Sequence, residues 1–278
     1  MTPERAISEL DYCVVDTETT GGKAEYSRIT EVAAFHYRDG IIYDKFHTLL
    51  NPGVSIPPWI TELTGISDVM VKDAPRFSEI ASKLREFLSR GVFVAHNAGF
   101  DYSFIQGEFL RLGQAWDAPK LCTVRVARHL FPELPSRSLG PLCAHLLIEI
   151  YDRHRAAGDA EATVYVLKHC LKLLAAKFGV LTWGELERWL TIGPLRLPEG
   201  LTIADIDALP EVAGSFVLKD AAGEAIMKGK STNIRKRVLT FFRAANRSKK
   251  AILYRDLVRS IDALVAETSA GRSPAVLS

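Results

Sequence analysis

Several features that would place this chain in a specialised class are scarce or missing. Its 278 residues include only four cysteines, none in a C-x-x-C pair, and their apolar neighbours favour reduced, buried thiols over disulfides or a zinc site. No apolar run approaches the roughly 18 residues of a membrane span, and the N-terminal segment lacks the apolar core of an export signal. Repeats and low-complexity tracts are also missing. We therefore expect a globular, cytoplasmic protein of the bacterial cytosol or nucleoid, with no membrane partner.

Acidic residues are nearly absent from one region. The formal net charge of the whole chain is only +2. Between Lys228 and Arg259, however, 11 Lys and Arg accompany a single acidic residue, Asp256. A cationic block of this density favours binding to a polyanion such as nucleic acid, although a solvated helix face would have the same composition.

The first 180 residues alternate strand-like and helix-like segments. Three apolar strands are expected in succession, the second and third joined by a tight turn at Asp39-Gly40. Helical spacing of apolar residues follows, interrupted by one short buried strand, and glycines mark the helix ends. This order predicts an α/β fold with one central sheet flanked by helices. The expected strands are 12–18, 28–37, 41–50 and 92–96, and the expected helices are 77–91, 101–113 and 160–179.

A change of composition suggests two domains. The segment "IGPLRLPEGL" contains two prolines and two glycines, which is typical of a connector. Beyond it, two short strands surround a turn at Asp220 to Gly223, and the chain then becomes helical and basic. We expect a first domain over 1–178, a linker over 179–205 and a small α+β domain over 206–278.

Acidic residues occur at three places where a strand ends or a helix begins. Asp16 and Glu18 end an apolar strand, and their i, i+2 spacing places both carboxylates on one face of it. Such a pair invites a metal ion, although it also suits a strand that merely emerges into solvent. Asp101 starts a helix, where it could serve as an N-cap. His154 precedes Asp159 by five residues at the head of a long helix, and all these groups could meet at one end of the sheet.

The segments "VVDTETTG", "HNAGFD" and "HRAAGD", with "LTGI" and "SLG" at fitting places, carry a family resemblance over about residues 10–178. They resemble the DnaQ-like 3′→5′ exonucleases of the DEDDh class, which include exoribonucleases and proofreading subunits such as the epsilon subunit of DNA polymerase III. The resemblance implies an RNase H-like fold. It also implies that Asp16, Glu18, Asp101 and Asp159 hold two Mg²⁺ or Mn²⁺ ions, and that His154 is the general base.

The same resemblance implies contacts with the 3′-terminal nucleotide. The glycine-rich turn after the first strand would allow close approach of the substrate, while apolar side chains would pack on its base or sugar. The residues in these implied contacts are Thr19, Thr20, Gly21, Leu63, Thr64, His96, Asn97 and Phe100.

The tetrapeptide "GKST" at Gly229 to Thr232 has the form of the end of a phosphate-binding P-loop. That motif requires glycine at position 224, which is Glu224 here. Residues from about 209 onward instead resemble a GIY-YIG domain, similar to the N-terminal nuclease domain of the excision-repair protein UvrC. The positions that carry this resemblance are Gly214, Phe216, Met227, Gly229 and Arg237.

This second domain departs from its family in its chemistry. Phe216 and Met227 stand where the family has tyrosines, and neither side chain has an ionisable hydroxyl. The family's metal-binding glutamate would fall just past Ser278, so either the sequence is truncated or the metal site is lost. We expect an impaired nuclease that still neutralises phosphates through basic residues, with a solvated surface as the alternative. Those residues are Lys228, Lys230, Arg235, Lys236, Arg237 and Arg243.

The leading hypothesis is thus a metal-dependent 3′→5′ exonuclease acting on DNA in proofreading or repair, tethered to a basic domain. An exoribonuclease that trims RNA 3′ ends is the alternative within enzymes. A nucleic-acid-binding repair scaffold is the alternative from another class, and an active GIY-YIG endonuclease is the least favoured. The partners expected are DNA 3′ ends or single strands and, in the alternative, RNA; the sequence identifies no polymerase or repair partner.

Overall fold

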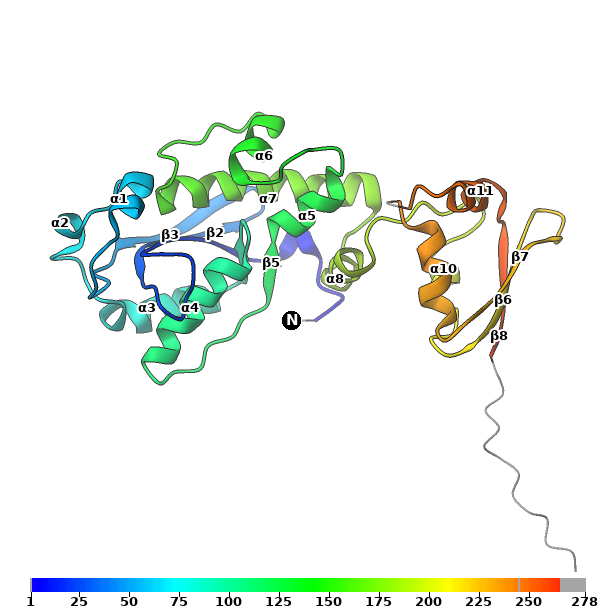
Figure 1. The fold of residues 1–278 in the computed structure, drawn as a ribbon, viewed down its shortest axis with the longest axis horizontal. Helices are drawn as coiled ribbons and strands as arrows, with labels where there is room; N and C mark the ends of the chain where they lie inside the picture. The colour runs from blue at the N-terminus through cyan, green and yellow to red at the C-terminus, as the bar shows by residue number, and fades with distance from the viewer. Residues whose placement is uncertain (1, 245, 266–278) are drawn as a thin grey trace, which may run out of the picture. The chain divides into compact units, whose positions relative to one another are not determined.

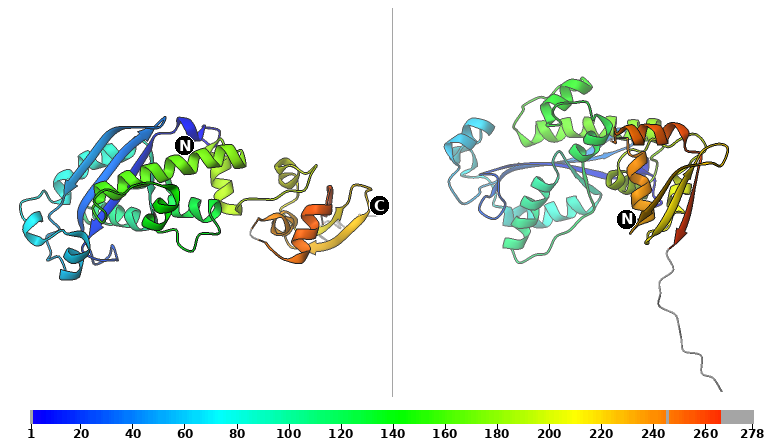
Figure 2. Two further views of the ribbon diagram at one scale, coloured as in Figure 1. Left: turned by 90° about the horizontal axis from the view of Figure 1, so that it is seen from above. Right: turned by 45° about the vertical axis from the view of Figure 1, so that its right-hand side comes forward.

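The computed structural model describes residues 2–244 and 246–265, and the chain forms two compact units, Met1–Leu190 and Thr191–Ser278 (Figures 1 and 2). Within the described residues, no helix has the length and apolar character needed to cross a membrane. The predicted limits of 178 and 206 for the two domains, with a linker between them, stay a prediction.

The first unit is built on a five-stranded mixed sheet in the order β3-β2-β1-β4-β5. The predicted three-strand meander is confirmed: β1 pairs antiparallel with β2, and β2 with β3. Its turn contains Asp39 and Gly40 with φ of 51° and 85°, which suits the expected D-G turn. β4 and β5 add in parallel on the other side of β1. The strands are β1 Tyr12–Thr19, β2 Ile29–Arg38, β3 Ile41–Leu49, β4 Val92–Ala95 and β5 Lys120–Cys122.

Helices cover both faces of this sheet because its strands alternate apolar side chains to either side. On one face, Tyr12 and Val14 of β1 pack with α5, α6 and α7; on the other, Cys13 and Val15 pack with α3 and α4 (Figure 1). The helical elements of this unit are η1 Ile7–Glu9, α1 Pro58–Thr64, α2 Asp68–Val71, α3 Phe77–Ser89, α4 Gly99–Arg111, α5 Thr123–Leu130, α6 Leu139–Leu146, α7 Ala156–Phe178 and α8 Trp183–Ile192.

Two glycines that were expected to end helices have different roles. Gly179 is the left-handed C-cap of α7, with φ of 62°, as its position predicts. Gly91 is not the cap of α3, which ends at Ser89 with Arg90 as its C-cap. A Cβ at Gly91 would lie 2.5 Å from the carbonyl oxygen of Asp11, so glycine is needed there for close packing of two backbones.

The segment predicted to be a linker contains regular structure. Helix α8 buries Trp183, Leu186 and Trp189 in the same core that covers α7. The five-residue helix α9, Ile203–Asp207, begins with a capping box in which Thr202 and Asp205 exchange hydrogen bonds. The chain between 179 and 205 is therefore folded at both ends.

The second unit is a three-stranded antiparallel sheet in the order β7-β6-β8, with helices packed on one face. Phe216 and Leu218 of β6 point to that face and contact α10. Gly229, Lys230 and Ser231 of the "GKST" sequence lie inside β7, not in a loop before a helix, so the P-loop interpretation is wrong. The elements are β6 Gly214–Lys219, β7 Ala225–Ser231, α10 Ile234–Phe242, α11 Lys249–Leu257 and β8 Ser260–Val265.

Candidate active site

The acidic residues of β1 lie beyond the point where its pairing with the neighbouring strand β4 ends. Pairing of β1 with β4 reaches only Val14↔Val94, so the later residues of β1 have an open edge on that side. Asp101 of α4 fills this edge: its Oδ1 accepts hydrogen bonds from the backbone nitrogen of Thr17, at 3.0 Å, and from the Thr17 hydroxyl, at 2.9 Å. Asp101 is therefore not the N-cap of its helix, a position occupied by Ala98.

Three of the predicted metal ligands converge. One carboxylate oxygen from each of Asp16, Glu18 and Asp159 lies within 4.8 Å of the other two. Asp159 reaches them from the first turn of α7, on the sheet face to which Asp16 and Glu18 both point. Its Oδ1 is buried and has no hydrogen-bond partner among the described residues. A buried, unpartnered carboxylate oxygen beside two others is what a bound cation would satisfy.

The electrostatics of this cluster call for a cation. Burial is the main cause that raises the pKa of all four carboxyls, to about 8 for Glu18 and about 7 for Asp101. The pKa of Asp16 is raised well above its usual value by burial and then by the charges of Asp101, Asp159 and Glu18. Burial also raises the pKa of Asp159. Divalent cations with oxygen ligands reverse such a cluster's charge, so these residues fit Mg²⁺ or Mn²⁺.

His154 lies on the loop directly before α7, as its motif predicts. Its backbone has φ of 61°, a conformation that is uncommon outside glycine. Its backbone nitrogen donates to Oδ2 of Asp159 at 3.3 Å. The loop that carries the predicted base and the carboxylate that is a predicted ligand are therefore bonded to each other.

The predicted substrate loop after β1 is closed by its own hydrogen bonds. The Thr19 hydroxyl donates to the carbonyl of Gly21 at 2.7 Å, and the Thr20 hydroxyl accepts from the backbone nitrogen of Arg28 at 3.0 Å. A Cβ at Gly21 would lie 2.7 Å from Oγ of Ser27, so the loop folds back tightly at this glycine. These bonds give the two threonines structural partners inside the loop.

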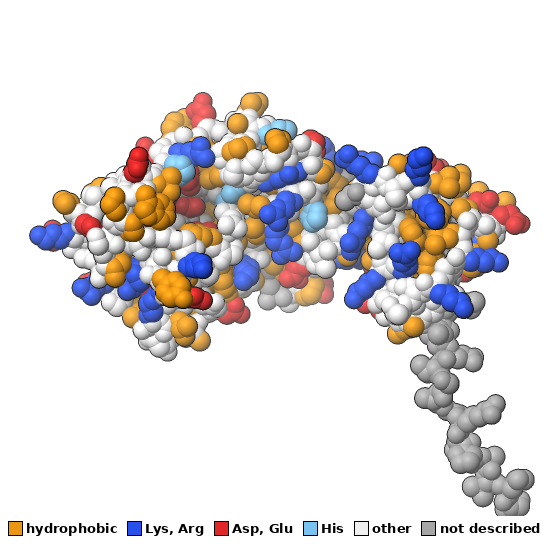
Figure 3. Space-filling model, in the orientation of Figure 1, with side chains coloured by type: hydrophobic (Ala, Val, Ile, Leu, Met, Phe, Trp, Pro, Cys, Tyr) orange, Lys and Arg blue, Asp and Glu red, His pale blue; other side chains and the backbone are white. Residues whose placement is uncertain are grey.

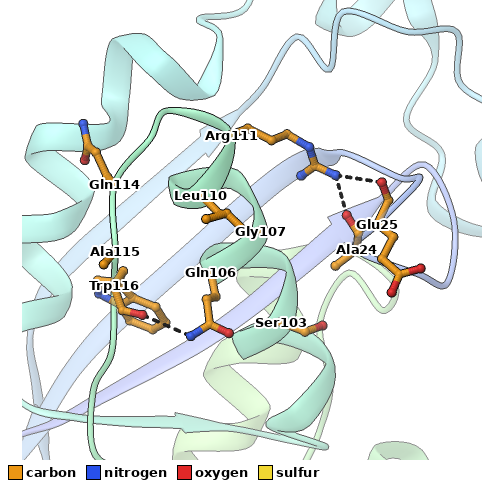
Figure 4. Close-up of a pocket in the computed structure, with 10 residues that line it drawn as sticks. All are labelled: Ala24, Glu25, Ser103, Gln106, Gly107, Leu110, Arg111, Gln114, Ala115 and Trp116. Carbon is orange, nitrogen blue, oxygen red and sulfur yellow. Dashed lines mark hydrogen bonds between the residues drawn. The ribbon is translucent and has the colours of Figure 1, made fainter.

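This loop is also anchored to α4 by groups that sequence reasoning missed. Glu108, only 2% exposed, accepts two hydrogen bonds from Arg28, at 2.7 and 2.8 Å. Arg111 donates to the carbonyls of Ala24 and Glu25 across a pocket of about 600 Å³ (Figure 4). A Glu and an Arg three residues apart on an amphipathic helix give no local sign of this role, because their partners lie some 80 residues earlier in the chain.

Leu63 and Thr64 occupy the end of α1 in different ways. Leu63 is 50% exposed, which leaves its side chain available to a ligand. Thr64 is buried, and its hydroxyl donates to the carbonyl of Ile60 at 2.9 Å and accepts from the backbone nitrogen of Ile66 at 3.1 Å. Leu63 thus has the exposure that a substrate contact needs, whereas Thr64 stabilises the helix end.

The segment after β4 holds the other three predicted contacts. Both ring nitrogens of His96 are engaged, with the Thr123 hydroxyl and with the carbonyl of Arg137, each at 2.9 Å. Burial lowers the pKa of His96 to about 4, which keeps its ring neutral. Asn97 is exposed with φ of 79°, and Phe100 packs on Phe104 with ring centroids 4.8 Å apart. His96 therefore joins β4, α5 and a later loop.

Glu31 was also missed, although its sequence context carries a signal. It is completely buried in the middle of the apolar strand β2 and is the cross-strand partner of Glu18. Burial raises the pKa of Glu31, but hydrogen bonds from Arg155, His47 and the backbone of Ala156 outweigh this and lower it. A charged residue inside an otherwise apolar strand usually has a buried partner, and that pattern is visible in "RITEVAAF".

The basic residues of the second unit do not form one surface. Arg235 is used internally, because its guanidinium bonds the carbonyls of Leu209 and Asp207 and the carboxylate of Glu211. Lys228 and Lys230 flank Gly229, whose cross-strand partner Phe216 faces the helices, so both lysines lie on the opposite face of the sheet. On the helix side, Lys and Arg spread over α10 and α11, while acidic side chains gather at the β6–β7 turn (Figure 3). The exposed predicted contacts there are Lys236, Arg237 and Arg243.

The remaining positions of the predicted GIY-YIG site are filled by packing. A Cβ at Gly229 would lie 2.5 Å from Cζ of Phe216, so the phenyl ring occupies the space over this glycine. The guanidinium of Arg237 lies over the Phe241 ring, 5.1 Å from its centroid. Gly214 begins β6 opposite Ser231, and Met227 is half-buried opposite Leu218. The position of the family's metal-binding glutamate lies outside the described residues.

Comparison with known proteins supports the family that the motifs of the first unit predict. The family described as Exonuclease (RNase_T) matches residues 13–167, a range that contains the converging carboxylates and His154. The chain belongs to this exonuclease family. Its mixed α/β sheet and acidic cluster are those of a DnaQ-like exonuclease domain.

The relatives found have nuclease or replication names. The chain is 35% identical over 268 residues to a Mycobacterium tuberculosis protein whose name proposes a bifunctional exonuclease/endonuclease, covering 93% of this chain and 41% of that one. It is 41% identical over 169 residues to the PolC-type DNA polymerase III of Bacillus cereus, covering 60% of this chain and 12% of the polymerase. The chain thus spans less than half the length of these curated relatives.

Among solved structures, Escherichia coli exonuclease I in complex with a dT13 oligonucleotide has a TM-score of 0.56, with 78% of this chain and 50% of that one covered. Sequence identity is 18%, so this likeness concerns the fold.

Proposed function

We propose that this chain is a two-metal-ion 3′→5′ exonuclease that hydrolyses phosphodiesters from the 3′ end of DNA, in proofreading or repair. The observation that carries the proposal is the convergence of Asp16, Glu18 and Asp159, together with the buried, unpartnered Oδ1 of Asp159. Asp101, which lies outside that cluster and bonds Thr17 at the open edge of β1, is proposed as the fourth ligand. The names of the relatives support a nuclease working with DNA.

Each group has a defined task in this proposal. Asp16, Glu18, Asp101 and Asp159 would hold two Mg²⁺ or Mn²⁺ ions, which lower the pKa of a water and stabilise the oxygens of the scissile phosphodiester. His154, on the loop bonded to Asp159, would take the proton of the attacking water. Exposed Leu63 packs against the terminal nucleotide.

For the second unit, we propose a degenerate GIY-YIG-like domain that binds nucleic acid without cutting it. The Mycobacterium relative supports a fusion of this kind, because its alignment covers 93% of the chain and its name combines two nuclease activities. Loss of cutting is proposed from Phe216 and Met227, which supply no hydroxyl at the two tyrosine positions. Phosphate neutralisation would fall to Lys236, Arg237 and Arg243 on the helix side.

The experiment compares the full chain with Asp16→Asn on a 3′-labelled single strand of DNA in Mg²⁺ or Mn²⁺. We expect release of the label by the parent and a loss of about 1,000-fold or more in the variant, since ligand removal withdraws several kcal/mol of transition-state stabilisation. Asp73→Asn, which changes an exposed carboxylate away from the cluster, is the matched control. Full activity in Asp16→Asn would refute the metal assignment.

The same assay separates the alternatives. A strand labelled at its 5′ end should retain its label until digestion is nearly complete, which establishes direction. An RNA strand of matched sequence tests the exoribonuclease alternative, because only RNA offers a 2′-hydroxyl. Strong binding with no cleavage of either strand would favour the repair scaffold.

A further inference from the structure

A fifth carboxylate, Glu31, lies beside the predicted metal site, but its hydrogen bonds are to groups other than the predicted metal ligands. It is the cross-strand partner of Glu18 and has no exposed surface. It accepts from Nε and Nη2 of Arg155 at 3.0 and 2.6 Å, and from the backbone nitrogen of Ala156 at 2.9 Å. His47 bonds it at 2.8 Å from β3. With both oxygens engaged in this way, Glu31 is a structural hub and not a further ligand.

These bonds act where the His154 loop becomes a helix. Arg155 is the N-cap residue of α7, and Ala156 is the first residue of that helix. Arg155 directly follows His154, so a two-pronged bond to Glu31 fixes the chain one residue from the predicted base. Because Glu31 belongs to β2, its bond to Arg155 fixes Arg155 relative to the sheet.

The loop itself is held in an unfavourable conformation. Asp152 and His154 both have positive φ, 53° and 61°. A Cβ at Gly158 would lie 1.9 Å from the carbonyl oxygen of Tyr151, so this loop rests directly on the first turn of α7. Strained backbone persists only where surrounding contacts determine it, and clusters at functional sites. Contacts that hold the loop include those at Gly158, at Asp159 and at Glu31.

We propose that Glu31 is a positioning residue that, through Arg155, holds the imidazole of His154 at the place where it takes a proton. This inference rests on the proposed exonuclease function. The carboxylate contributes no proton and binds no substrate. Its charge balances that of Arg155, so the helix start is anchored without leaving an unpaired cation beside the metal site.

The test is a double-substitution cycle on the full chain with the DNA strand and Mg²⁺. Glu31→Gln should lower kcat about 10–100-fold with KM near that of the parent, in the range of other partners that orient a reacting ligand. In a His154→Ala background, the same change should have little further effect, because the group that it positions is gone. Glu161→Gln, which removes a partly exposed carboxylate from the same helix, is the matched control.

Thermal unfolding and Mn²⁺ binding are measured for every variant. If Glu31→Gln does not fold, Gly158→Ala displaces the loop without changing any charge and should show the same dependence on His154. A kcat loss that is as large without His154 as with it would overturn the positioning role, as would no loss at all. Full activity of His154→Ala would instead overturn the proposed base, which distinguishes the two failures.

Discussion

The predicted sites of the two units differ in the side chains that fill them. In the first, Asp16, Glu18 and Asp159 gather in a place where burial raises the pKa of each carboxyl. In the second, Phe216 fills the space over Gly229, and Arg237 covers the ring of Phe241. Apolar packing stabilises a fold, whereas a cluster of like charges destabilises it unless a cation is bound. A carboxylate cluster that needs a cation therefore favours chemistry in the first unit, and the aromatic packing in the second supports our proposal that this unit does not cut.

The largest test of this contrast uses a closed circular DNA. A closed circle has no 3′ end, and Phe216 and Met227 supply no hydroxyl at the two predicted tyrosine positions, so neither the parent nor Asp16→Asn is expected to nick it. On a linear strand, Asp16→Asn should lower exonuclease activity by about 1,000-fold or more. Conversion of closed to open circles, measured on a gel, is the readout. Nicking by Asp16→Asn would show that the second unit cuts, and the contrast would fail.

The next test compares DNA binding by the basic residues on the two sides of the second unit's sheet. Replacing Lys236, Arg237 and Arg243 by Gln should weaken single-strand binding about tenfold and reduce its salt slope by about 2. The pair Lys228→Gln/Lys230→Gln should have less effect, because the other face of the sheet also carries an acidic residue. Lys228 and Asp262 are the two cross-strand partners of Val217, and Lys219 forms an ion pair with Asp262. Anisotropy titrations at several salt concentrations measure both. Equal effects would mean that neither face is preferred.

A smaller effect on activity is expected from the loop that follows β1 in the first unit. Arg111→Gln should raise KM by about tenfold or less and leave kcat nearly unchanged, since it releases the carbonyls of Ala24 and Glu25. Arg85→Gln, which also frees a loop carbonyl, that of Ala115, is the control. Steady-state kinetics on the labelled strand decide. A fall in kcat alone would assign Arg111 to the chemistry and not to the loop.

The smallest effect concerns stability against pH. In the metal-free protein, Glu18 and Asp101 have folded pKa values of about 8 and about 7, above those of the unfolded chain. The folded form thus binds more protons, and stability declines as pH rises from about 4 to 8. In EDTA, Tm should fall between pH 5.5 and 8, by about 2–4 °C for each kcal/mol of stability lost. Mg²⁺ should restore more at the higher pH. A flat profile in EDTA, or one that Glu18→Gln leaves unchanged, would contradict the raised pKa values.

Much of this molecule follows from local pattern. Alternating apolar residues and a D-G pair are sufficient to predict the β1–β2–β3 meander, and the i, i+2 spacing of Asp16 and Glu18 to place both on one face. The metal-ligand roles came instead from the resemblance of three motifs to the DnaQ-like exonucleases, and Asp16, Glu18 and Asp159 do converge. These features depend on near neighbours and on the fixed period of a strand.

Other features were decided by tertiary structure, because the partners lie far apart in the chain. Asp101 meets Thr17 across 84 residues only because β4 stops short of the end of β1, and Glu31 meets Arg155 across 124. Gly91 is required by the Asp11 backbone and not by a helix cap. The basic run that the sequence presents as one block is divided by the alternation of β7, and Arg235 is withdrawn into the fold. The amino-acid sequence supplies the groups that are available for chemistry. Strand pairing and packing bring some of them together, since only packing places distant residues within bonding distance.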